Sequence, residues 1–489
     1  MNFRKFDYLV VFLIALIFYG YFIKQGDWNI NSRLGLVKAV VEESRLTIDT
    51  YHTGDFATED KAFANGHYYS DKAIGASILG AIAYWPIYKL NGAISSYSLF
   101  VMLITLLAIS VPAALLAPLI YKMVLNSTHE RWFALAVASF ICIGTAIFPY
   151  AGAFYGHSLA AMMAFGAFCL WMDVNQFDAT ITTGRSFLSG LLIGFLVITE
   201  YPTALIAAIL IGYALYIVWS KKALTDWKFL LPFAAGGGIA LALLLFYNAI
   251  CFGSPFTTGY AFENLKEFQE SYNSGVMAFA WPNPVTLFYM TFHAAQGVFI
   301  QSPVLFIAMG GIFWAAQNKS LRAEFITAMS IILIFFLMFS GVRLWWGGDA
   351  FSSRYLIPVL PFFAVFVIQL PKRWYPLFIG LGIISITQML IASATTFNGI
   401  NLAMEKIVET GVSFSWQSFL LYSILLPRLL KNKLTLTWGN HLLGIQSWYF
   451  NLAIPILAAG GLLIVFYLIG RQSEAPVSRS LEHDSPISN

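Results

Sequence analysis

Long apolar segments alternate with short polar ones along the whole chain, and this pattern constrains the fold more than any motif does. The apolar windows are close to the roughly 20 residues that a helix needs to cross a bilayer. Of the 489 residues, 59% are hydrophobic and only 11% are charged, and one water-soluble core could not absorb that much apolar surface. The sequence therefore predicts an all-α polytopic membrane protein.

We expect about twelve transmembrane helices. The windows fall at about 6–23, 97–121, 132–149, 158–174, 186–199, 203–220, 229–249, 298–316, 323–340, 355–370, 374–393 and 449–470. A further apolar segment, 73–90, is short, contains Pro86 and ends in residues typical of a membrane interface. If it lies flat on the outer surface, the lysine-rich and arginine-rich loops share the cytoplasmic side with the N-terminus, as the positive-inside rule requires. We therefore predict a juxtamembrane helix at 73–90.

This topology places one transmembrane domain at 1–470. Its long extracytoplasmic loops are 24–96, 250–297 and 394–448. No small-residue cleavage site follows the first apolar run, so we expect an uncleaved span. Residues 471–489 are polar and predict a disordered cytoplasmic tail. Most polar motifs of the sequence lie in these long loops, on one side of the membrane. We therefore expect the active site on the extracytoplasmic side of a bacterial inner membrane.

Several classes of function are excluded by the same sequence. A net charge of +4 spread over many loops offers no basic face for nucleic acid. The three cysteines, Cys142, Cys169 and Cys251, lie in apolar surroundings without metal-binding spacing. The sequence contains no Gly-rich phosphate loop between a strand and a helix, so a nucleotide-binding site is not expected. The absence of an internal repeat counts against a transporter built from two halves.

The first outer loop carries the densest polar motifs. Apolar residues recur at helical spacing over 34–41 and predict an amphipathic helix on the membrane, capped by Ser32 or Asn31. Arg33 at its start opposes the helix dipole and favours contact with an anion. Further on, "SDKAIG" places Ser70 or Asp71 at the start of 73–90 with Lys72 beside it, which suits a lipid phosphate. The alternative is a capping Asp71 beside an interfacial Lys72.

These motifs resemble the GT-C superfamily of polyprenyl-phosphate-sugar glycosyltransferases, nearest to its aminoarabinose-transferase and protein O-mannosyltransferase branch. In that branch an acid-Arg-aromatic motif opens the first surface helix, and an acid-Lys-Pro-Pro motif opens the third. "SDKAIG" is similar to the second motif, which implies that Asp71 is acidic and metal-binding and that Lys72 binds the donor phosphate. "NINSRL" is similar to the first motif, with Arg33 at the arginine but Asn in place of the acid.

The missing acid leaves the catalytic base to another carboxylate. Asp60 is the first candidate and Asp27 the second. The resemblance implies a GT-C fold with juxtamembrane helices in the first extracytoplasmic loop. It also implies that His293, just before the span at 298–316, lies near the donor phosphate or a metal.

Other outer-face residues complete the predicted site. His157 is either a substrate-binding residue or a hydrogen-bonded residue at the interface. Glu200 would cost about 2–3 kcal/mol in lipid, so it should face a polar cavity. Arg354, beside Asp349, can bind two phosphate oxygens with its planar fork, and its alternative role is an interfacial anchor. The remaining substrate-binding candidates are His67 and the aromatic residues placed to stack on a sugar: Tyr68, Tyr69, Trp345 and Trp346.

The sequence as a whole predicts an inverting glycosyltransferase. It would move a sugar from a polyprenyl-monophosphate donor to a hydroxyl of a glycan, lipid or protein acceptor, with membrane lipids around it. Lys72, Arg354 and Arg33 would neutralise the leaving phosphate. A divalent metal at Asp71 and His293 is left open, and no other cofactor is expected. The alternatives are a transporter or lipid-linked sugar flippase, and a ligase that uses a diphosphate-linked donor.

Overall fold

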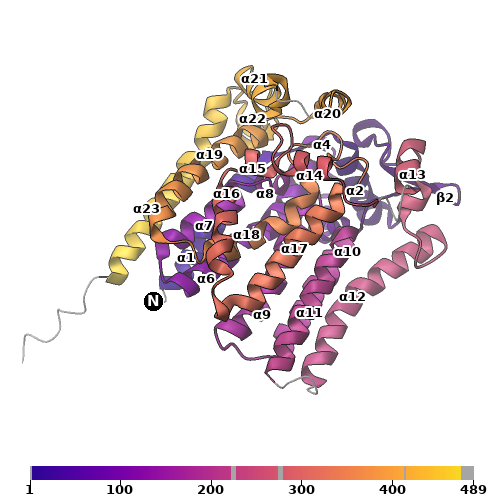
Figure 1. Cartoon of the computed structure of the whole chain (residues 1–489). Helices are drawn as coiled ribbons and strands as arrows, with labels where there is room; N and C mark the ends of the chain where they lie inside the picture. The colour runs from indigo at the N-terminus through magenta and orange to yellow at the C-terminus, as the bar shows by residue number, and fades with distance from the viewer. Residues whose placement is uncertain (1–2, 222–226, 274–278, 412–414, 475–489) are drawn as a thin grey trace, which may run out of the picture.

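Helices make up nearly all of the regular structure in the computed structural model, which describes residues 3–221, 227–273, 279–411 and 415–474 (Figure 1). The helices are α1 (Phe3–Tyr21), α2 (Trp28–Lys38), α3 (Gly75–Asn91), α4 (Tyr97–Thr105), α5 (Val111–Ala114), α6 (Leu116–Thr128), α7 (Arg131–Ile143), α8 (Ile147–Ala151), α9 (His157–Gln176), α10 (Thr183–Thr199), α11 (Ala204–Ser220), α12 (Trp227–Phe252), α13 (Lys266–Asn273), α14 (Pro284–Thr291), α15 (Val298–Gln301), α16 (Val304–Ala315), α17 (Arg322–Ser340), α18 (Phe363–Val367), α19 (Tyr375–Ala394), α20 (Ile400–Glu409), α21 (Leu426–Leu430), α22 (Trp438–Leu443) and α23 (Trp448–Glu474). The strands of the described chain are short: β1 (Phe22–Ile23), β2 (Lys61–Ala64), β3 (His67–Ser70) and β4 (Leu436–Thr437).

Seven described helical segments are long and apolar enough to cross a membrane. They are Tyr97–Thr128, His157–Gln176, Tyr201–Ser220, Phe229–Phe252, Lys319–Ser340, Lys372–Ala394 and Trp448–Arg471. Shorter apolar helices accompany them, among them Arg131–Ile143 and Thr183–Thr199. The prediction of an all-α polytopic membrane protein is confirmed, and each predicted window contains helix. The number of spans stays a prediction.

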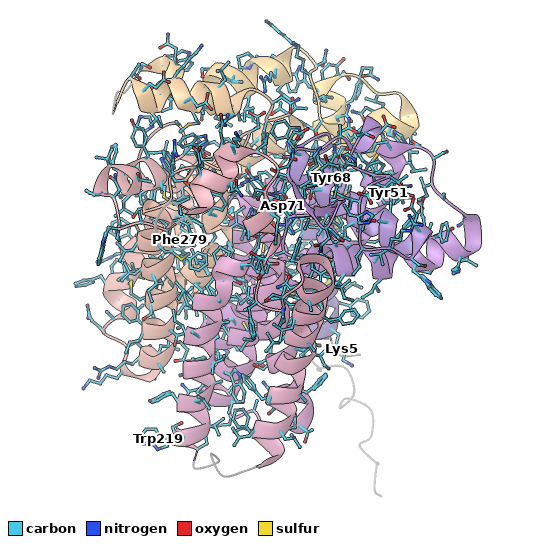
Figure 2. All side chains as sticks on the ribbon, turned by 90° about the vertical axis from the view of Figure 1, so that its right-hand side faces the viewer. Lys5, Tyr51, Tyr68, Asp71, Trp219 and Phe279 are labelled. Atoms are coloured by element: carbon cyan, nitrogen blue, oxygen red, sulfur yellow. The ribbon has the colours of Figure 1, made fainter. Side chains whose placement is uncertain are left out.

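The first outer loop and the loops assigned to the cytoplasm lie toward opposite ends of the molecule. In Figure 2, Asp71, Tyr68 and Tyr51 occupy the upper part, whereas Lys5 and Trp219 lie below. The long apolar helices run between these two ends in Figure 1. The polar residues of the first loop are therefore gathered at one end of the helical bundle.

Helix α2 differs from the predicted surface helix in two respects. Every residue from Ile30 to Lys38 is buried, so neither face of the helix is open. Its cap is Asp27, whose Oδ1 accepts a hydrogen bond from the Ile30 amide at 3.0 Å, and not Ser32 or Asn31. Lys38, which an amphipathic surface helix would expose to water, is buried instead. Its ammonium lies 2.6 Å from Glu42 and within 6 Å of four aromatic ring centroids.

The segment after α2 forms a β-hairpin that the apolar pattern did not indicate. Strands β2 and β3 pair antiparallel from Lys61–Ser70 to Ala64–His67. Asn65 and Gly66 connect them with φ angles of 52° and 82°, the positive values that a two-residue hairpin turn requires. Ser70 and Asp71 therefore end the hairpin, while α3 begins later, at Gly75, without a side-chain cap.

The C-terminal region folds back onto the start of the first loop. Strand β4 pairs antiparallel with β1, and α23 packs against α1. The predicted loop 394–448 contains α20, α21 and α22, which lie together at the top of Figure 1. Helix α23 continues through Glu474, and the rest of the predicted tail, 475–489, lies outside the described residues.

Candidate functional site

Lys72 lies at the centre of a group of acidic side chains, which we call the Lys72 centre: Lys72, Asp60, Asp71 and Glu263. Its ammonium nitrogen is 3.0 Å from Asp60 Oδ2 and 2.5 Å from Asp71 Oδ2. The lysine and both aspartates are buried. Buried charges of this kind are stable only when they are paired. The positive charge of the Lys72 ammonium is therefore already compensated by two carboxylates.

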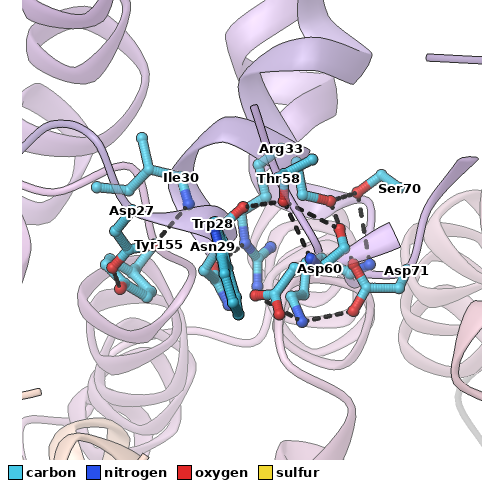
Figure 3. A network of polar contacts seen from close by, with 12 residues as sticks. Asp27, Trp28, Asn29, Ile30, Arg33, Thr58, Asp60, Ser70, Asp71 and Tyr155 are labelled. Carbon is cyan, nitrogen blue, oxygen red and sulfur yellow. Dashed lines mark hydrogen bonds and ion pairs between the residues drawn. The ribbon is translucent and has the colours of Figure 1, made fainter. Parts of the chain in front are cut away.

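Residues of three different segments hold this centre in place. Ser32 of α2 donates to Asp71 Oδ1 at 3.2 Å and lies 2.8 Å from the Ser70 hydroxyl. Thr58 accepts a hydrogen bond from the Asp60 amide at 3.1 Å and donates to the Trp28 carbonyl at 2.8 Å (Figure 3). The Trp28 side chain, next to Asp27, remains 47% exposed. The hairpin and α2 are thus locked together around the two aspartates.

Glu263 brings the second outer loop to the same centre. It bridges Ala62 of β2, and the next amide, Asn264, donates to the Lys61 carbonyl at 3.0 Å. Its carboxyl is buried, and Asp71 is one of the charges that act on it. Burial, followed by the charge of Asp71, raises the pKa of Glu263 to about 10. Glu263 is therefore a neutral acid at physiological pH.

The pKa values of Asp60 and Lys72 are also shifted. Burial raises the pKa of Asp60, and the attraction of Lys72 opposes part of this rise. For Lys72, burial lowers the pKa, but Asp60 and Asp71 outweigh it and the pKa is raised. Asp60 is thus a carboxylate whose proton affinity is increased while its ammonium partner keeps its charge. That combination suits a general base better than an exposed aspartate does.

Arg33 and Glu200 connect this centre to the rest of the site. The Arg33 guanidinium donates to Asn29 Oδ1 at 3.0 Å, to the Ala73 carbonyl at 2.8 Å and to Glu200 Oε1 at 3.3 Å. His157 Nδ1 lies 3.5 Å from the same Glu200 oxygen. Glu200 therefore has polar partners in Arg33 and His157, and each nitrogen of the Arg33 guanidinium donates one hydrogen bond.

A second cationic group, the Arg354 centre, consists of Arg354, Tyr155, Tyr355, His157 and Asp27. The guanidinium carbon lies 5.1 Å from the Tyr155 ring centroid and 5.4 Å from that of Tyr355. The His157 ring stacks on Tyr155 at 5.7 Å and meets Tyr355 edge to face at 6.0 Å. The Tyr155 hydroxyl donates to Asp27 Oδ2. This cation is surrounded mainly by aromatic rings.

Arg354 has no carboxylate partner among the described residues, and its Nε is a buried donor without a hydrogen bond. Gly347 lies directly beside it: a Cβ there would come within 2.5 Å of the Arg354 Nε, and φ is +75°. Only glycine accommodates both conditions without strain. The backbone is therefore shaped to leave the guanidinium in place with donor capacity to spare.

The remaining predicted residues lie in other surroundings. His67 is exposed and lies 2.7 Å from Asp49, whereas Tyr69 is buried against Phe252. Trp346 donates to Asn401 Oδ1 at 2.8 Å, and Asp349 accepts from the Asn401 amide at 2.8 Å. His293 is fully buried beside Tyr289, with ring centroids 4.5 Å apart. The contacts of His67, Tyr69, Trp346 and Asp349 given above thus lie outside the Lys72 and Arg354 centres.

A metal site at Asp71 and His293 stays a prediction. Within the described ranges, no group of three or more His, Cys, Asp or Glu side chains is arranged to hold a metal ion. Asp71 instead accepts hydrogen bonds from Lys72 and Ser32. The carboxylates of the Lys72 centre are therefore matched to an ammonium in this structure.

Sequence reasoning missed Glu263 and the partners that orient the cations. Glu263 lies in "GYAFENL", a loop without an obvious motif, and only its carboxylate in an apolar context could have drawn attention. Tyr155 lies two residues before His157 in "FYGHS", a stretch that had been singled out for the histidine alone. Both residues join the site through contacts distant in sequence.

Comparisons with known proteins give distant similarities only. No family model and no curated protein matches the chain. Among solved structures, it is similar to ArnT from Cupriavidus metallidurans bound to undecaprenyl phosphate, with a TM-score of 0.45 and 15% identity over 96% of this chain and 76% of that one. It is also similar to the archaeal oligosaccharyltransferase AglB from Archaeoglobus fulgidus in complex with an inhibitory peptide and a dolichol-phosphate.

For AglB, the TM-score is 0.43 and the identity is 12%. The match covers 97% of this chain, which spans 56% of the length of AglB. At these low values the function of the chain has to be argued from its own residues.

Proposed function

We propose that the protein is a glycosyltransferase that takes a sugar from a polyprenyl-monophosphate donor and transfers it to an acceptor hydroxyl. One observation carries this proposal: an Arg354 guanidinium without a carboxylate ion pair lies over Tyr155, whose hydroxyl donates to Asp27. Asp27 begins the helix whose Trp28 carbonyl accepts from Thr58, and Thr58 in turn accepts from the amide of the paired, buried Asp60. An unmatched cation suits a phosphate, and a carboxylate with raised proton affinity suits a base. The bundle of apolar helices suits a lipid-linked substrate.

The two centres divide the reaction between them. The acceptor oxygen forms a bond to the anomeric carbon as its proton passes to Asp60, with Asp27 as the second candidate. The bond between that carbon and the phosphate oxygen breaks, and its electron pair stays on the phosphate. The donor phosphodiester carries one negative charge and the departing monophosphate carries two, so a cation at Arg354 stabilises the leaving group. A single displacement of this kind inverts the anomeric carbon.

The other cations take supporting roles in this proposal. Lys72 was predicted to bind the donor phosphate, but its ammonium is paired with Asp60 and Asp71. We assign it to the orientation of Asp60, and we assign Arg33 to the orientation of Glu200. Trp28 is exposed beside Asp27 and is the aromatic surface that we assign to the sugar. A sugar ring packs well on such a surface.

Release of the lipid phosphate tests the proposal without knowledge of the acceptor. Purified protein would be incubated with a panel of radiolabelled polyprenyl-monophosphate sugars and a membrane extract as acceptor source. We expect the appearance of free polyprenyl monophosphate, with loss in the Arg354→Ala and Asp60→Asn variants. Release of polyprenyl diphosphate from a diphosphate-linked donor would favour a ligase instead. Movement of an intact labelled lipid across a vesicle membrane would favour a flippase.

The outer-face location is a second part of the proposal. Cysteines at Asn65, in the hairpin turn, and at Asn91, at the end of α3, should react with an impermeant thiol reagent added from outside. A cysteine at Ser127 should react only after permeabilisation, because Lys122 and Arg131 flank that loop. The native cysteines, which are all buried, would be replaced first. If Asn91 is inaccessible while Ser127 reacts from outside, the segment 73–90 spans the membrane, and His157, Glu200, Asp349 and Arg354 would lie on the opposite side from Asp60 and Lys72.

A further inference from the structure

Lys24 is a buried lysine whose ammonium donates to backbone carbonyls. Its ammonium donates to the Ala392 carbonyl at 2.8 Å, to the Ser393 carbonyl at 3.0 Å and to the Thr395 carbonyl. Only 6% of the residue is exposed, and no carboxylate in the described chain forms an ion pair with it. A buried charge without a counter-ion is unusual and calls for a specific reason.

The reason is the end of α19. The last four carbonyls of a helix have no partner within the helix, and in α19 each of them is satisfied from elsewhere. Thr395 Oγ1 donates to Ile391, Lys24 donates to Ala392 and Ser393, and the Thr435 amide donates to Ala394 at 2.9 Å. Lys24, almost 370 residues away in sequence, supplies two of these four bonds. It therefore acts as the cap of α19.

The geometry requires the charged form of the side chain. Burial alone lowers the pKa of Lys24, but three carbonyl acceptors need three N–H donors, and a neutral amine has only two. The C-terminal end of a helix carries partial negative charge, which favours a cation there. The Phe397 ring centroid lies 4.1 Å from the ammonium and adds a cation–π contact. The helix end and the ring together replace a counter-ion.

Lys24 is also connected to the segments that carry Tyr155 and Arg354. Its amide donates to the Gly152 carbonyl at 2.8 Å, in the turn that leads to Tyr155. The Phe397 ring lies 5.9 Å from Tyr150 and 6.0 Å from Phe351. The Tyr150 hydroxyl lies 3.1 Å from both the amide and the carbonyl of Phe351, three residues before Arg354. The Phe397 ring, on which the Lys24 ammonium packs, thus contacts both segments that carry the Arg354 centre.

We propose that Lys24 is a positioning residue for the Arg354 centre: by capping α19 and packing on Phe397, it fixes the segments that carry Tyr155 and Arg354. Lys24 itself touches no reacting atom. The effect of Lys24 on lipid binding rests on the proposed function, because it assumes that Arg354 binds the donor phosphate. The effect of Lys24 on the order of the two segments does not depend on that function.

The test uses full-length protein in detergent with three variants. Lys24→Met removes the charge at similar volume, Lys24→Arg keeps a charge, and Lys89→Met serves as the control because Lys89 is an exposed lysine on α3. Hydrogen exchange would be followed in the peptides that cover 395–400 and 150–155, and binding of polyprenyl monophosphate would be measured. For Lys24→Met we expect faster exchange in both peptides and about tenfold weaker binding, since small displacements of a binding group have effects of this size or larger.

The control variant should match wild type in both measurements, and Lys24→Arg should recover part of the binding. If Lys24→Met is too unstable to purify, Phe397→Leu tests the same connection with the cap intact and should weaken binding in the same way. Wild-type binding in both Lys24→Met and Phe397→Leu would overturn the proposal, as would unchanged exchange in 395–400. If the wild-type protein itself binds no polyprenyl monophosphate, the proposed function fails, and the exchange data still decide the role of Lys24.

Discussion

Lys72 and Arg354 are both cations of the same polar site, but their surroundings differ. Lys72 is paired with Asp60 and Asp71, and Glu263 adds a third carboxyl. Arg354 lies among Tyr155, Tyr355 and His157 and has no carboxylate partner in the described chain. Aromatic rings attract a cation without neutralising it. The difference separates a cation that is already paired with carboxylates from one that can still bind an anion.

This separation refines the interpretation of the sequence, which had assigned both residues to the donor phosphate. A cation held by two carboxylates would have to give up one of them before it could bind phosphate. Arg354 needs no such exchange, because its Nε is buried without a partner. We therefore expect substitutions in the two centres to affect different steps of the reaction.

The largest effect is expected for Asp60→Asn. Loss of the base should lower kcat by about 10²–10⁴-fold, while binding of the donor lipid changes little, because the phosphate lies at the other centre. Release of polyprenyl monophosphate under saturating donor, together with donor binding, measures this. Asp27→Asn is the matched variant. An active Asp60→Asn beside an inactive Asp27→Asn would move the base to Asp27.

Arg354→Ala should weaken donor binding as well as lower kcat, because Arg354 contacts the phosphate both before and during its departure. Removal of the unpaired guanidinium should weaken donor binding by about 100-fold, since bonds between charged groups contribute about 1.5–3 kcal/mol each. Arg354→Lys should lie between the two, because it keeps the charge but loses the fork. Direct binding of polyprenyl monophosphate is the measurement. Equal affinity in Arg354→Ala and wild type would contradict the contrast between the centres.

Stability should distinguish the centres in a third way. Lys72→Met leaves Asp60 and Asp71 buried without their partner and should destabilise the protein by about 3–5 kcal/mol. Arg354→Met leaves no carboxylate unpaired and should lose much less. Thermal unfolding of the two variants at one pH gives the comparison. Equal losses would mean that the carboxylates of the Lys72 centre are stable without the lysine.

A pH-dependent effect is expected for Glu263→Gln. The pKa of Glu263 is raised from 4.5 to about 10 in the folded protein, so the folded state keeps a proton that the unfolded chain loses at lower pH. The stability linked to this group is complete below its unfolded pKa and falls as the pH rises through this window. Glutamine does not ionise. The variant should therefore gain in melting temperature over wild type as the pH is raised from about 5 to about 9.

A melting-temperature difference that stays constant between about pH 5 and about pH 9 would contradict a protonated Glu263. Glu267→Gln is a suitable control in the same experiment, because Glu267 is exposed on α13. It should show no trend with pH.

The smallest effect is expected for His67→Ala. His67 is exposed at the hairpin and paired with Asp49, outside both centres. Its loss should leave kcat and donor binding within about twofold of wild type, as for most surface substitutions. The same release assay measures it. A loss comparable to that of Asp60→Asn would extend the site beyond the Lys72 centre and restore the role that the sequence predicted.

Local patterns account for much of what the sequence predicted correctly. Apolar windows gave the helices of the bundle, because burial in a bilayer requires about 20 consecutive apolar residues whatever their neighbours are. The same sequence also contained a hairpin signal that the apolar pattern concealed: Asn65-Gly66 marks a two-residue turn. It went unused because β-structure was not expected in a chain of helices.

Candidate residues were predicted less evenly. The sequence selected Asp27, Asp60, Lys72 and Arg354 because charged residues are rare in this chain and these lie in its outer loops. It could not separate them into two centres, since this depends on contacts such as that between Lys72 and Asp60. Glu263 and Tyr155 were missed for the same reason, because their roles come from partners in other segments.

The sequence by itself determined that this protein is a bundle of apolar helices with its acidic and basic residues gathered in a few polar loops. Hydropathy and helix length are local properties, and they need no knowledge of tertiary contacts. Only the tertiary structure decided which cation is neutralised and which is left with donors free, and that Lys24 caps a helix almost 370 residues away. Pairing depends on distances of about 3 Å between groups far apart in the chain, and such distances are set by the packing of the whole molecule.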